Sequence, residues 1–272
     1  MELSGKKVAE ALKKKMKCST HPILATLRVG EVPSDVAYER GLGKRLLELG
    51  MEVKHFTLPD TVSQEELNQK IEELNNDKHI HGIIVFQPLP HGLSAHAIAP
   101  NKDVDCSTLI NQGKLLAGLP CYQPNAAAAV IALLEHYRIP LLGTKVTLIG
   151  RSSVVGRPLS ILLIQAGATV TVCNSQTKNL PQIARSSGIL ISAVGQPNFI
   201  TPEFVHDKQL VVDIGTNYVD GKLCGDISPE IHHIVGGYTP TPGGIGPVTT
   251  MVLAKQVADS TIGLPAPVFL GR

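Results

Sequence analysis

The sequence predicts an α/β protein of two domains, each a parallel sheet covered by helices, with a cleft between the domains. Short runs rich in β-branched residues alternate with helical patterns along the chain. Strands separated by helices form parallel sheets with both faces covered. The length of 272 residues is enough for two cores, and a passage from 88 to 124 with few periodic signals separates two series of elements.

The first series is strand, helix, strand, helix, strand. We expect strands at PILATLRV (22–29), EVKHFTL (52–58) and GIIVF (82–86), and a helix over 35–49. Ser63 and Glu66 form a capping-box pattern that opens the second helix. A lysine-rich amphipathic helix precedes the series at the N-terminus.

The second series begins with a helix at NAAAAVIALLEHYR (125–138). We expect four strands, KVTLIG, ATVTVC, GILISAV and LVVDIG, with helices over 154–166 and 180–187. A last helix, over 246–262, is expected to return to the first domain. The predicted domains are therefore residues 1–122 with 247–272, and residues 123–246.

Composition excludes several classes of protein. The 25 basic and 23 acidic residues form no basic block, which argues against a nucleic-acid partner. The five scattered cysteines and the spacing of the ten histidines predict neither a disulfide scaffold nor a metal site. The apolar runs are too short to span a bilayer. We therefore expect a soluble, cytoplasmic protein without a metal.

The stretch from 145 to 177 is typical of a dinucleotide-binding turn. A strand runs into Gly150, and Gly156 begins the next helix, whose N-terminus would face a pyrophosphate. The next strand ends in VCNSQT, which lacks the acidic residue that binds the ribose of NAD. Together with Arg151, this favours NADP over NAD. The alternative is that Arg151 is a solvated turn residue.

Four motifs, in this order along the chain, make the sequence resemble the bifunctional methylenetetrahydrofolate dehydrogenase/methenyltetrahydrofolate cyclohydrolase family. They are GRSSVVGRP (150–158), DIGTN (213–217), GDI (225–227) and TPTPGGIGPVTT (239–250). The resemblance implies a Rossmann-type NADP-binding second domain, a tetrahydrofolate substrate and a homodimer. It implies cofactor contacts from Gly150, Arg151, Ser152, Val155, Gly156, Ser175 and Thr216. It places beside the folate the loop residues Pro242, Gly243, Gly244, Gly246 and Pro247.

The folate half departs from the family pattern. The family has a tyrosine followed four residues later by a lysine, on one helical face; Tyr38 matches the catalytic tyrosine, and Leu42 occupies the lysine position. Phe86 replaces a glutamine, with Gln87 displaced by one, and Asp105 matches the pterin-binding carboxylate. The family's PCTPxG reads PNAAAA here, at 124–129. The resemblance thus implies a substrate site with Tyr38 and Asp105 retained and an apolar wall at Leu42.

Gly41 and Gly43 lie inside the helix that carries Tyr38, although each glycine costs about 1 kcal/mol relative to alanine there. Two explanations stay open. The glycines let the helix deform or a bulkier ligand approach, or they reflect drift in a loosened helix end.

These observations lead to one main hypothesis and two alternatives. The main hypothesis is an NADP-dependent methylenetetrahydrofolate dehydrogenase with weak or absent cyclohydrolase activity, because hydrolysis must activate a water and the lysine that assists it is missing. The first alternative is an NADP enzyme that acts on a different iminium or aminal substrate. The second is a non-catalytic binding protein, against which the retained Tyr38 and Asp105 argue.

Overall fold

Two compact units make up the chain. The computed structural model describes residues 1–16 and 21–263. The three-stranded unit contains Lys15–Asn125 and the described residues from Thr250 onward; the five-stranded unit contains Met1–Lys14 and Ala126–Thr249. In this division Met1–Lys14 and residues 247–249 belong to the five-stranded unit and residues 123–125 to the three-stranded unit, whereas the expected domains had each of these segments in the other one.

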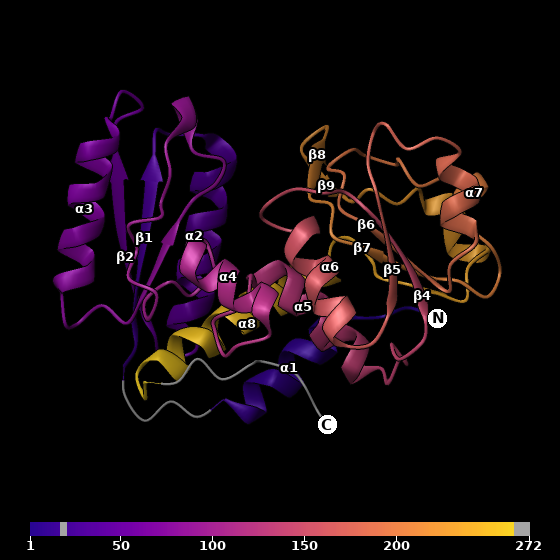
Figure 1. Ribbon diagram of the computed structural model, residues 1–272, viewed down its shortest axis with the longest axis horizontal. Coiled ribbons are helices and arrows are strands. Elements are labelled where there is room, and N and C mark those ends of the chain that lie inside the picture. The colour runs from indigo at the N-terminus through magenta and orange to yellow at the C-terminus, as the bar shows by residue number, and fades with distance from the viewer. Residues whose placement is uncertain (17–20, 264–272) are drawn as a thin grey trace. The chain divides into compact units, whose positions relative to one another are not determined.

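The three-stranded unit has a parallel sheet in the order β2-β1-β3. Its strands are β1 (Ile23–Val29), β2 (Glu52–Leu58) and β3 (Gly82–Val85). The helices α2 (Pro33–Leu47) and α3 (Gln64–Asn76) lie on opposite faces of this sheet (Figure 1). The capping box of Ser63 and Glu66 is present at the start of α3. The predicted βαβαβ series is therefore confirmed.

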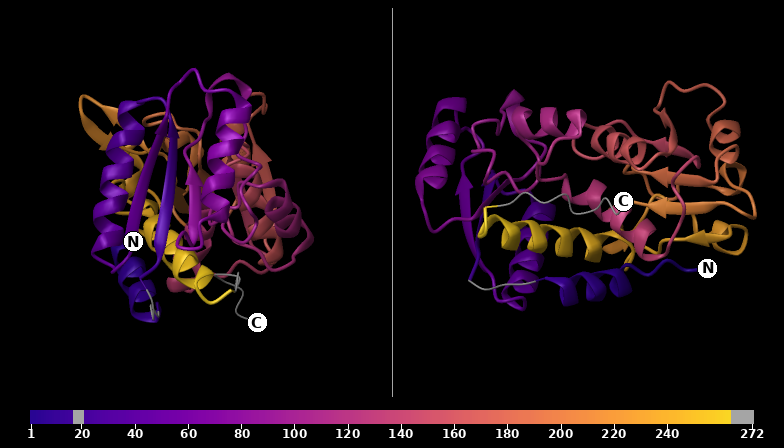
Figure 2. Two further views of the ribbon diagram at one scale, coloured as in Figure 1. Left: turned by 90° about the vertical axis from the view of Figure 1, so that its left-hand side faces the viewer. Right: turned by 60° about the horizontal axis from the view of Figure 1, so that its bottom comes forward.

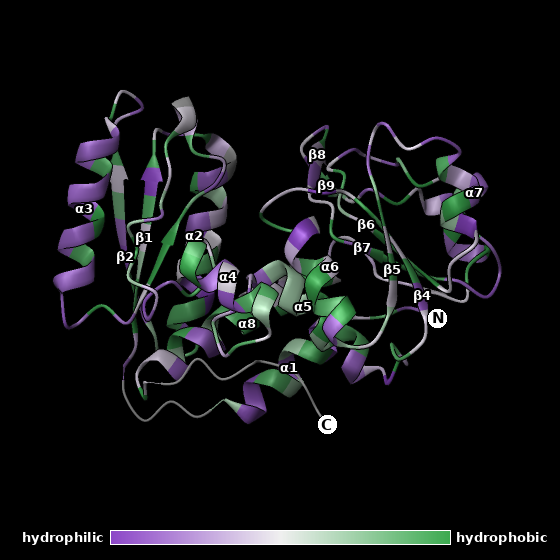
Figure 3. Ribbon diagram, in the orientation of Figure 1, coloured by the Kyte–Doolittle hydropathy of each residue, from purple (hydrophilic) through white to green (hydrophobic). Residues whose placement is uncertain are grey.

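Each face of this sheet has its own core. On the α3 side, Leu67 and Ile71 pack with Leu27 of β1. On the α2 side, Leu42 and Leu46 pack with Leu253 of α8 (Ile245–Ser260). The helix α8 is uninterrupted (Figure 2) and largely apolar, whereas most residues of α3 are hydrophilic (Figure 3). The part of α8 from Thr250 onward thus contributes to the α2-side core.

The passage from 88 to 124 contains a helix that the sequence analysis did not predict, α4 (Leu109–Ala117). Thr108 caps its N-terminus and donates its hydroxyl to the buried carboxylate of Asp103 at 2.7 Å. The same carboxylate accepts a hydrogen bond from Asn111. A short 3₁₀ turn, η1 (Pro90–Gly92), also lies in this passage.

The five-stranded unit has a parallel sheet in the order β10-β7-β6-β4-β5. The predicted strands appear as β4 (Lys145–Ile149), β5 (Thr169–Cys173), β6 (Ile189–Ser192) and β7 (Leu210–Asp213). The helices are α1 (Gly5–Lys15), α5 (Asn125–His136), α6 (Gly156–Gln165) and α7 (Leu180–Arg185), with 3₁₀ turns η2 (Pro202–Phe204) and η3 (Pro229–His233). The hairpin β8 (Asn217–Val219) and β9 (Lys222–Cys224) and the short β10 (Gly237–Tyr238) were not predicted.

The two glycines of α2 have different surroundings. A Cβ added at Gly41 meets no atom within 4 Å, whereas one added at Gly43 lies 3.2 Å from Nε2 of His55. Gly43 therefore leaves room for the His55 ring. At Gly41 no neighbouring atom of the described residues requires a glycine, because an added Cβ would meet open space.

Replacing Gly41 with alanine is expected to raise the free energy of unfolding by about 1 kcal/mol, because alanine has the better helix propensity and the added methyl group meets open space. Gly43→Ala is the matched comparison and should gain less, since the His55 ring must move. Urea unfolding followed by circular dichroism measures both changes. An equal gain at the two positions would contradict the role given to His55.

Candidate functional site

Asp105 lies in the three-stranded unit and is held by hydrogen bonds from distant parts of the chain. Asn125 donates its backbone N–H and its Nδ2 to Oδ1 of Asp105, at 2.9 and 2.7 Å. Gln256 of α8 in turn donates Nε2 to the side-chain oxygen of Asn125, at 2.8 Å. Among the described residues, none donates to Oδ2 of Asp105. Oδ1 of the carboxylate is thus fixed in place by Asn125, and Oδ2 accepts no hydrogen bond from the described residues.

The environment shifts two pKa values at this site. Desolvation raises the pKa of Asp105 to about 7, although the hydrogen bonds from Asn125 act in the opposite direction. Tyr38 has a side chain that is 48% exposed, but its hydroxyl lies among protein atoms. Desolvation, together with the charge of Asp105, raises the pKa of Tyr38 to about 12, and the Arg45 guanidinium lowers it. The negative charge of Asp105 therefore reaches the Tyr38 hydroxyl.

Leu42 and Phe86 lie in contrasting environments. Leu42 is 2% exposed and belongs to the α2-side core, so it offers almost no surface to a ligand in this structure. Phe86 and Gln87 follow the last residue of β3 instead of lying within the strand. The Phe86 ring contacts Tyr38 edge to face, with 5.9 Å between ring centroids. Gln87 is exposed.

A buried polar cluster that the sequence analysis missed lies beside Tyr38 along α2. Glu39 accepts hydrogen bonds from Oγ1 of Thr26 at 2.6 Å and from Nε of Arg28 at 3.1 Å. His55 of β2 places Nδ1 at 3.2 Å from the same carboxylate. Because its partners belong to β1 and β2, Glu39 fixes the helix that carries Tyr38 to the sheet. The sequence signal for this cluster was the presence of two polar residues, Thr26 and Arg28, two positions apart and therefore on one face of an otherwise apolar predicted strand.

The turn after β4 needs glycine at two positions. Gly150 has φ 123°, and a Cβ there would lie 2.4 Å from the carbonyl oxygen of Ala193. A Cβ at Gly156 would lie 2.2 Å from the carbonyl oxygen of Gly150. Ser152 accepts hydrogen bonds from the N–H groups of Val155 and Gly156. This close backbone approach before α6 fits the pyrophosphate of a dinucleotide.

The neighbouring strand ends are tied together by two aspartates that the sequence analysis did not select. Asp226 accepts hydrogen bonds from Ser192 at the end of β6 and from the N–H groups of the loop that follows. Asp213 accepts from Gly215 and from the backbone of Asp226. Desolvation raises the pKa of Asp213 to about 6. Both aspartates thus shape the carboxyl edge of the sheet, where dinucleotides bind in open α/β folds.

The remaining predicted residues also lie in the five-stranded unit. Arg151, Ser175 and Thr216 are exposed and follow β4, β5 and β7. The glycine-rich loop leads into α8, and in it Gly244 lies against Gly5, whose added Cβ would overlap the Gly244 carbonyl. Its predicted members are Pro242, Gly243, Gly244, Gly246 and Pro247. No cluster of histidine, cysteine or acidic side chains within the described residues has the arrangement of a metal site.

Two sequence models of one family match this chain. The catalytic domain of tetrahydrofolate dehydrogenase/cyclohydrolase matches residues 3–105, and the NAD(P)-binding domain of the same family matches residues 124–262. The chain belongs to this family. The predictions of the family, of two α/β domains and of a nicotinamide-cofactor domain with a tetrahydrofolate-family catalytic domain are confirmed.

Relatives and solved structures of the tetrahydrofolate dehydrogenase/cyclohydrolase family agree with this. The "Bifunctional protein FolD" of Dictyoglomus thermophilum is 41% identical over 268 residues, which cover 94% of this chain and 95% of the relative. The bifunctional FolD enzyme of Campylobacter jejuni has a TM-score of 0.90 at 34% identity, covering 96% and 98% of the two chains. The FolD of Trypanosoma brucei, solved with NADP cofactor and inhibitor, has a TM-score of 0.87 at 29% identity, covering 97% and 98%.

No helix in the described part of the chain has the length and apolar character needed to cross a membrane.

The sequence predicted Asp105 as a site residue, but it did not predict Asn125 and Gln256, which hold Asp105 in place. Asn125 lies in PNAAAA, the stretch that departs from the family motif. A departure in sequence thus contributes a hydrogen-bond donor to the retained carboxylate.

Proposed function

We propose that this protein is an NADP-dependent methylenetetrahydrofolate dehydrogenase whose methenyltetrahydrofolate cyclohydrolase activity is weak or absent. The observation that carries the second half is Leu42, which occupies the family's lysine position and is packed into the core at 2% exposure. In this proposal the residues matched to the catalytic domain hold the folate, and those matched to the NAD(P)-binding domain hold NADP.

The dehydrogenase step needs little from the protein beyond positioning. NADP, when bound, supplies the acceptor for the hydride. Departure of the hydride from the methylene bridge is assisted by the lone pair of the adjacent folate nitrogen, so no general base is required. Asp105 accepts N–H donors of the pterin, and its charge also reaches the Tyr38 hydroxyl. The ionised Asp105 also stabilises the positive charge that develops on the methenyl product.

Hydrolysis of that methenyl cation requires a water to be activated and a proton to be moved. Leu42 supplies neither a charge nor a proton acceptor. Arg45, whose charge reaches Tyr38, keeps its proton at any accessible pH and cannot act as a base. The replacement of an ammonium group by Leu42 also removes a positive charge that would oppose formation of the cation. The site therefore supports oxidation better than hydrolysis.

One assay tests both parts of the proposal, the presence of dehydrogenase activity and the weakness or absence of cyclohydrolase activity. The purified protein is mixed with methylenetetrahydrofolate and NADP, and the absorbances of NADPH and of the methenyl compound are followed together. We expect NADPH to form and the methenyl compound to decay no faster than in buffer. Absence of NADPH would refute the dehydrogenase, and rapid enzyme-dependent loss of the methenyl compound would refute the loss of cyclohydrolase activity.

A second candidate is an NADP enzyme for a different iminium or aminal compound. The contact between Phe86 and Tyr38 favours it, because an aromatic ring stands where the family has glutamine. NADPH formation with such a compound, but not with methylenetetrahydrofolate, would favour this candidate.

The family resemblance also supports a cytoplasmic protein that forms a homodimer. Sedimentation of the purified protein would check whether it is a dimer.

The cofactor preference gives a separate prediction. Arg151 is exposed at the dinucleotide turn, and no carboxylate follows β5 to repel a 2′-phosphate. Arg151→Ala is expected to weaken NADP binding by about 1.5 to 3 kcal/mol, the range for a hydrogen bond to a charged group, and to leave NAD binding nearly unchanged. Fluorescence titration with both cofactors measures the two losses. Equal losses would contradict the assignment to the 2′-phosphate.

A further inference from the structure

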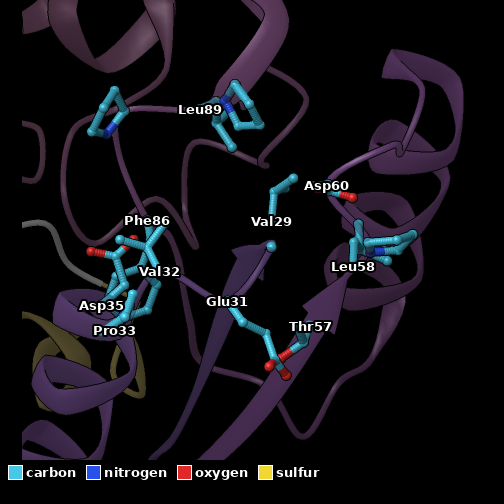
Figure 4. A pocket seen from close by; sticks show the side chains of 14 residues that line it. Val29, Glu31, Val32, Pro33, Asp35, Thr57, Leu58, Asp60, Phe86 and Leu89 are labelled. Atoms are coloured by element: carbon cyan, nitrogen blue, oxygen red, sulfur yellow. The ribbon is translucent and has the colours of Figure 1, made fainter.

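A cavity of about 940 Å³ opens at the carboxyl ends of the three strands of the three-stranded unit. Figure 4 shows Val32 and Phe86 on one side, Leu58 and Asp60 on the other, and Val29 between them. Most of the lining side chains are apolar, and they come from the last residues of β1 and β2, the first turn of α2 and the segments that follow the three strands. The volume is that of a small-molecule site.

Phe86 connects this cavity with the proposed substrate site. Its ring lines the cavity and also contacts the Tyr38 ring edge to face, at 5.9 Å between centroids. Tyr38 lies within electrostatic reach of Asp105. A ligand whose polar ring binds Asp105 and whose next ring lies by Tyr38 can therefore continue past Phe86 into the cavity.

The charges around the cavity have one sign. Glu31, Asp35 and Asp60 line it, and no lysine or arginine is among its lining residues in the described part of the chain. Asp35 lies in the first turn of α2, where a carboxylate offsets the partial positive charge of the helix N-terminus. Glu31 and Asp60 are exposed, and neither makes an ion pair within the described residues. These two carry the uncompensated negative charge.

The buried cation Arg28, which is hydrogen-bonded to two lining residues, does not cancel this charge. Arg28 donates NH1 to the carbonyl of Gly30 and NH2 to Thr57, which both line the cavity. Its guanidinium is paired with the buried Glu39, so the pair as a whole is neutral. A ligand in the cavity therefore meets the field of Glu31 and Asp60.

We propose that this cavity receives the p-aminobenzoyl-glutamate end of the folate, and that Glu31 and Asp60 make the protein select folates with a short tail over those with poly-γ-glutamyl tails. The proposal rests on the proposed folate substrate. Apolar walls and Phe86 suit an aromatic ring. Each added γ-linked glutamate brings one more carboxylate, which is repelled by the two acidic side chains.

Calorimetric titration with tetrahydrofolate carrying one and five glutamates, under anaerobic conditions, tests the proposal. At low ionic strength we expect the Kd for the pentaglutamate to exceed that for the monoglutamate by about threefold or more, and the difference to shrink in high salt. The double variant Glu31→Gln and Asp60→Asn should bring the two Kd values together. The matched control, Glu48→Gln with Glu52→Gln, removes the same charge at residues outside the cavity lining and should keep the difference.

Equal or tighter binding of the pentaglutamate by the unmodified protein would overturn the proposal, as would an equal effect of the control variant. Absence of binding by both tail lengths would overturn it too, because the cavity would then belong to no folate site. The proposed function is decided separately, by whether NADPH forms from monoglutamyl methylenetetrahydrofolate.

Discussion

Replacement of Asp105 by asparagine is expected to weaken folate binding by about 1.5 to 3 kcal/mol, which is about 10- to 150-fold in Kd. The carboxylate accepts donors from the pterin edge, whereas the amide presents an N–H group at one of the two oxygen positions. The fold should persist, because the amide oxygen can still accept both hydrogen bonds from Asn125. Calorimetry measures the Kd, and circular dichroism checks the fold.

The pH dependence of this binding has a definite sign. The Asp105 pKa is raised to about 7 by desolvation, so the carboxylate becomes charged as the pH rises through about 7. Folate affinity is therefore expected to increase from pH 6 to pH 8.5 in the unmodified protein and to stay flat over this range in Asp105→Asn. Unchanged affinity in the variant would instead support a loop-capping role for Asp105, a common role of aspartate.

Stability should depend on pH in the opposite direction. Because its pKa is raised, folded Asp105 holds its proton more tightly than the unfolded chain between its ordinary value of 3.8 and about 7. The free energy of unfolding contributed by this group therefore falls as the pH rises through that window, and the whole loss is present above it. The unmodified protein should lose stability relative to Asp105→Asn across this window.

The strands were predictable because buried parallel strands leave a local signal. The runs LATLRV and VTLI contain few polar residues, since both faces of the sheet are covered. The helix α4 left no such signal. Its buried side chains are Asn111 and Leu115, and Leu109 and Leu116 are exposed, so its apolar residues do not follow the helical period.

The site was predictable where a motif identifies a residue and unpredictable where partners are distant in sequence. Asp105 stands in a recognisable motif, but its partner Asn125 lies in another segment, and Gln256 lies 131 residues beyond Asn125. Helical spacing placed Leu42 near the face of Tyr38. It could not show that Leu42 is in the core while about half of Tyr38 is exposed. Leu42 is buried because it packs against α8, which comes from a distant part of the sequence.

Replacement of Gly156 by alanine is expected to distort the dinucleotide turn. The added Cβ would lie 2.2 Å from the carbonyl oxygen of Gly150 and 2.9 Å from the Cα of Arg151. Both neighbours are backbone atoms, so relief requires the turn to move. We expect the free energy of unfolding to fall by about 2 to 3 kcal/mol, the upper part of the range for overpacking. Urea unfolding measures this loss.

The same movement should weaken NADP binding, because the backbone N–H groups before α6 would no longer face the pyrophosphate together. Gly188→Ala is the matched control in the same unit: its added Cβ has only ordinary contacts, the nearest being Cγ2 of Thr144 at 3.7 Å. The control should keep its NADP affinity, as measured by fluorescence titration. If Gly156→Ala folds and binds NADP as tightly as the unmodified protein, the cofactor lies elsewhere, because a pyrophosphate held by this turn depends on its backbone path.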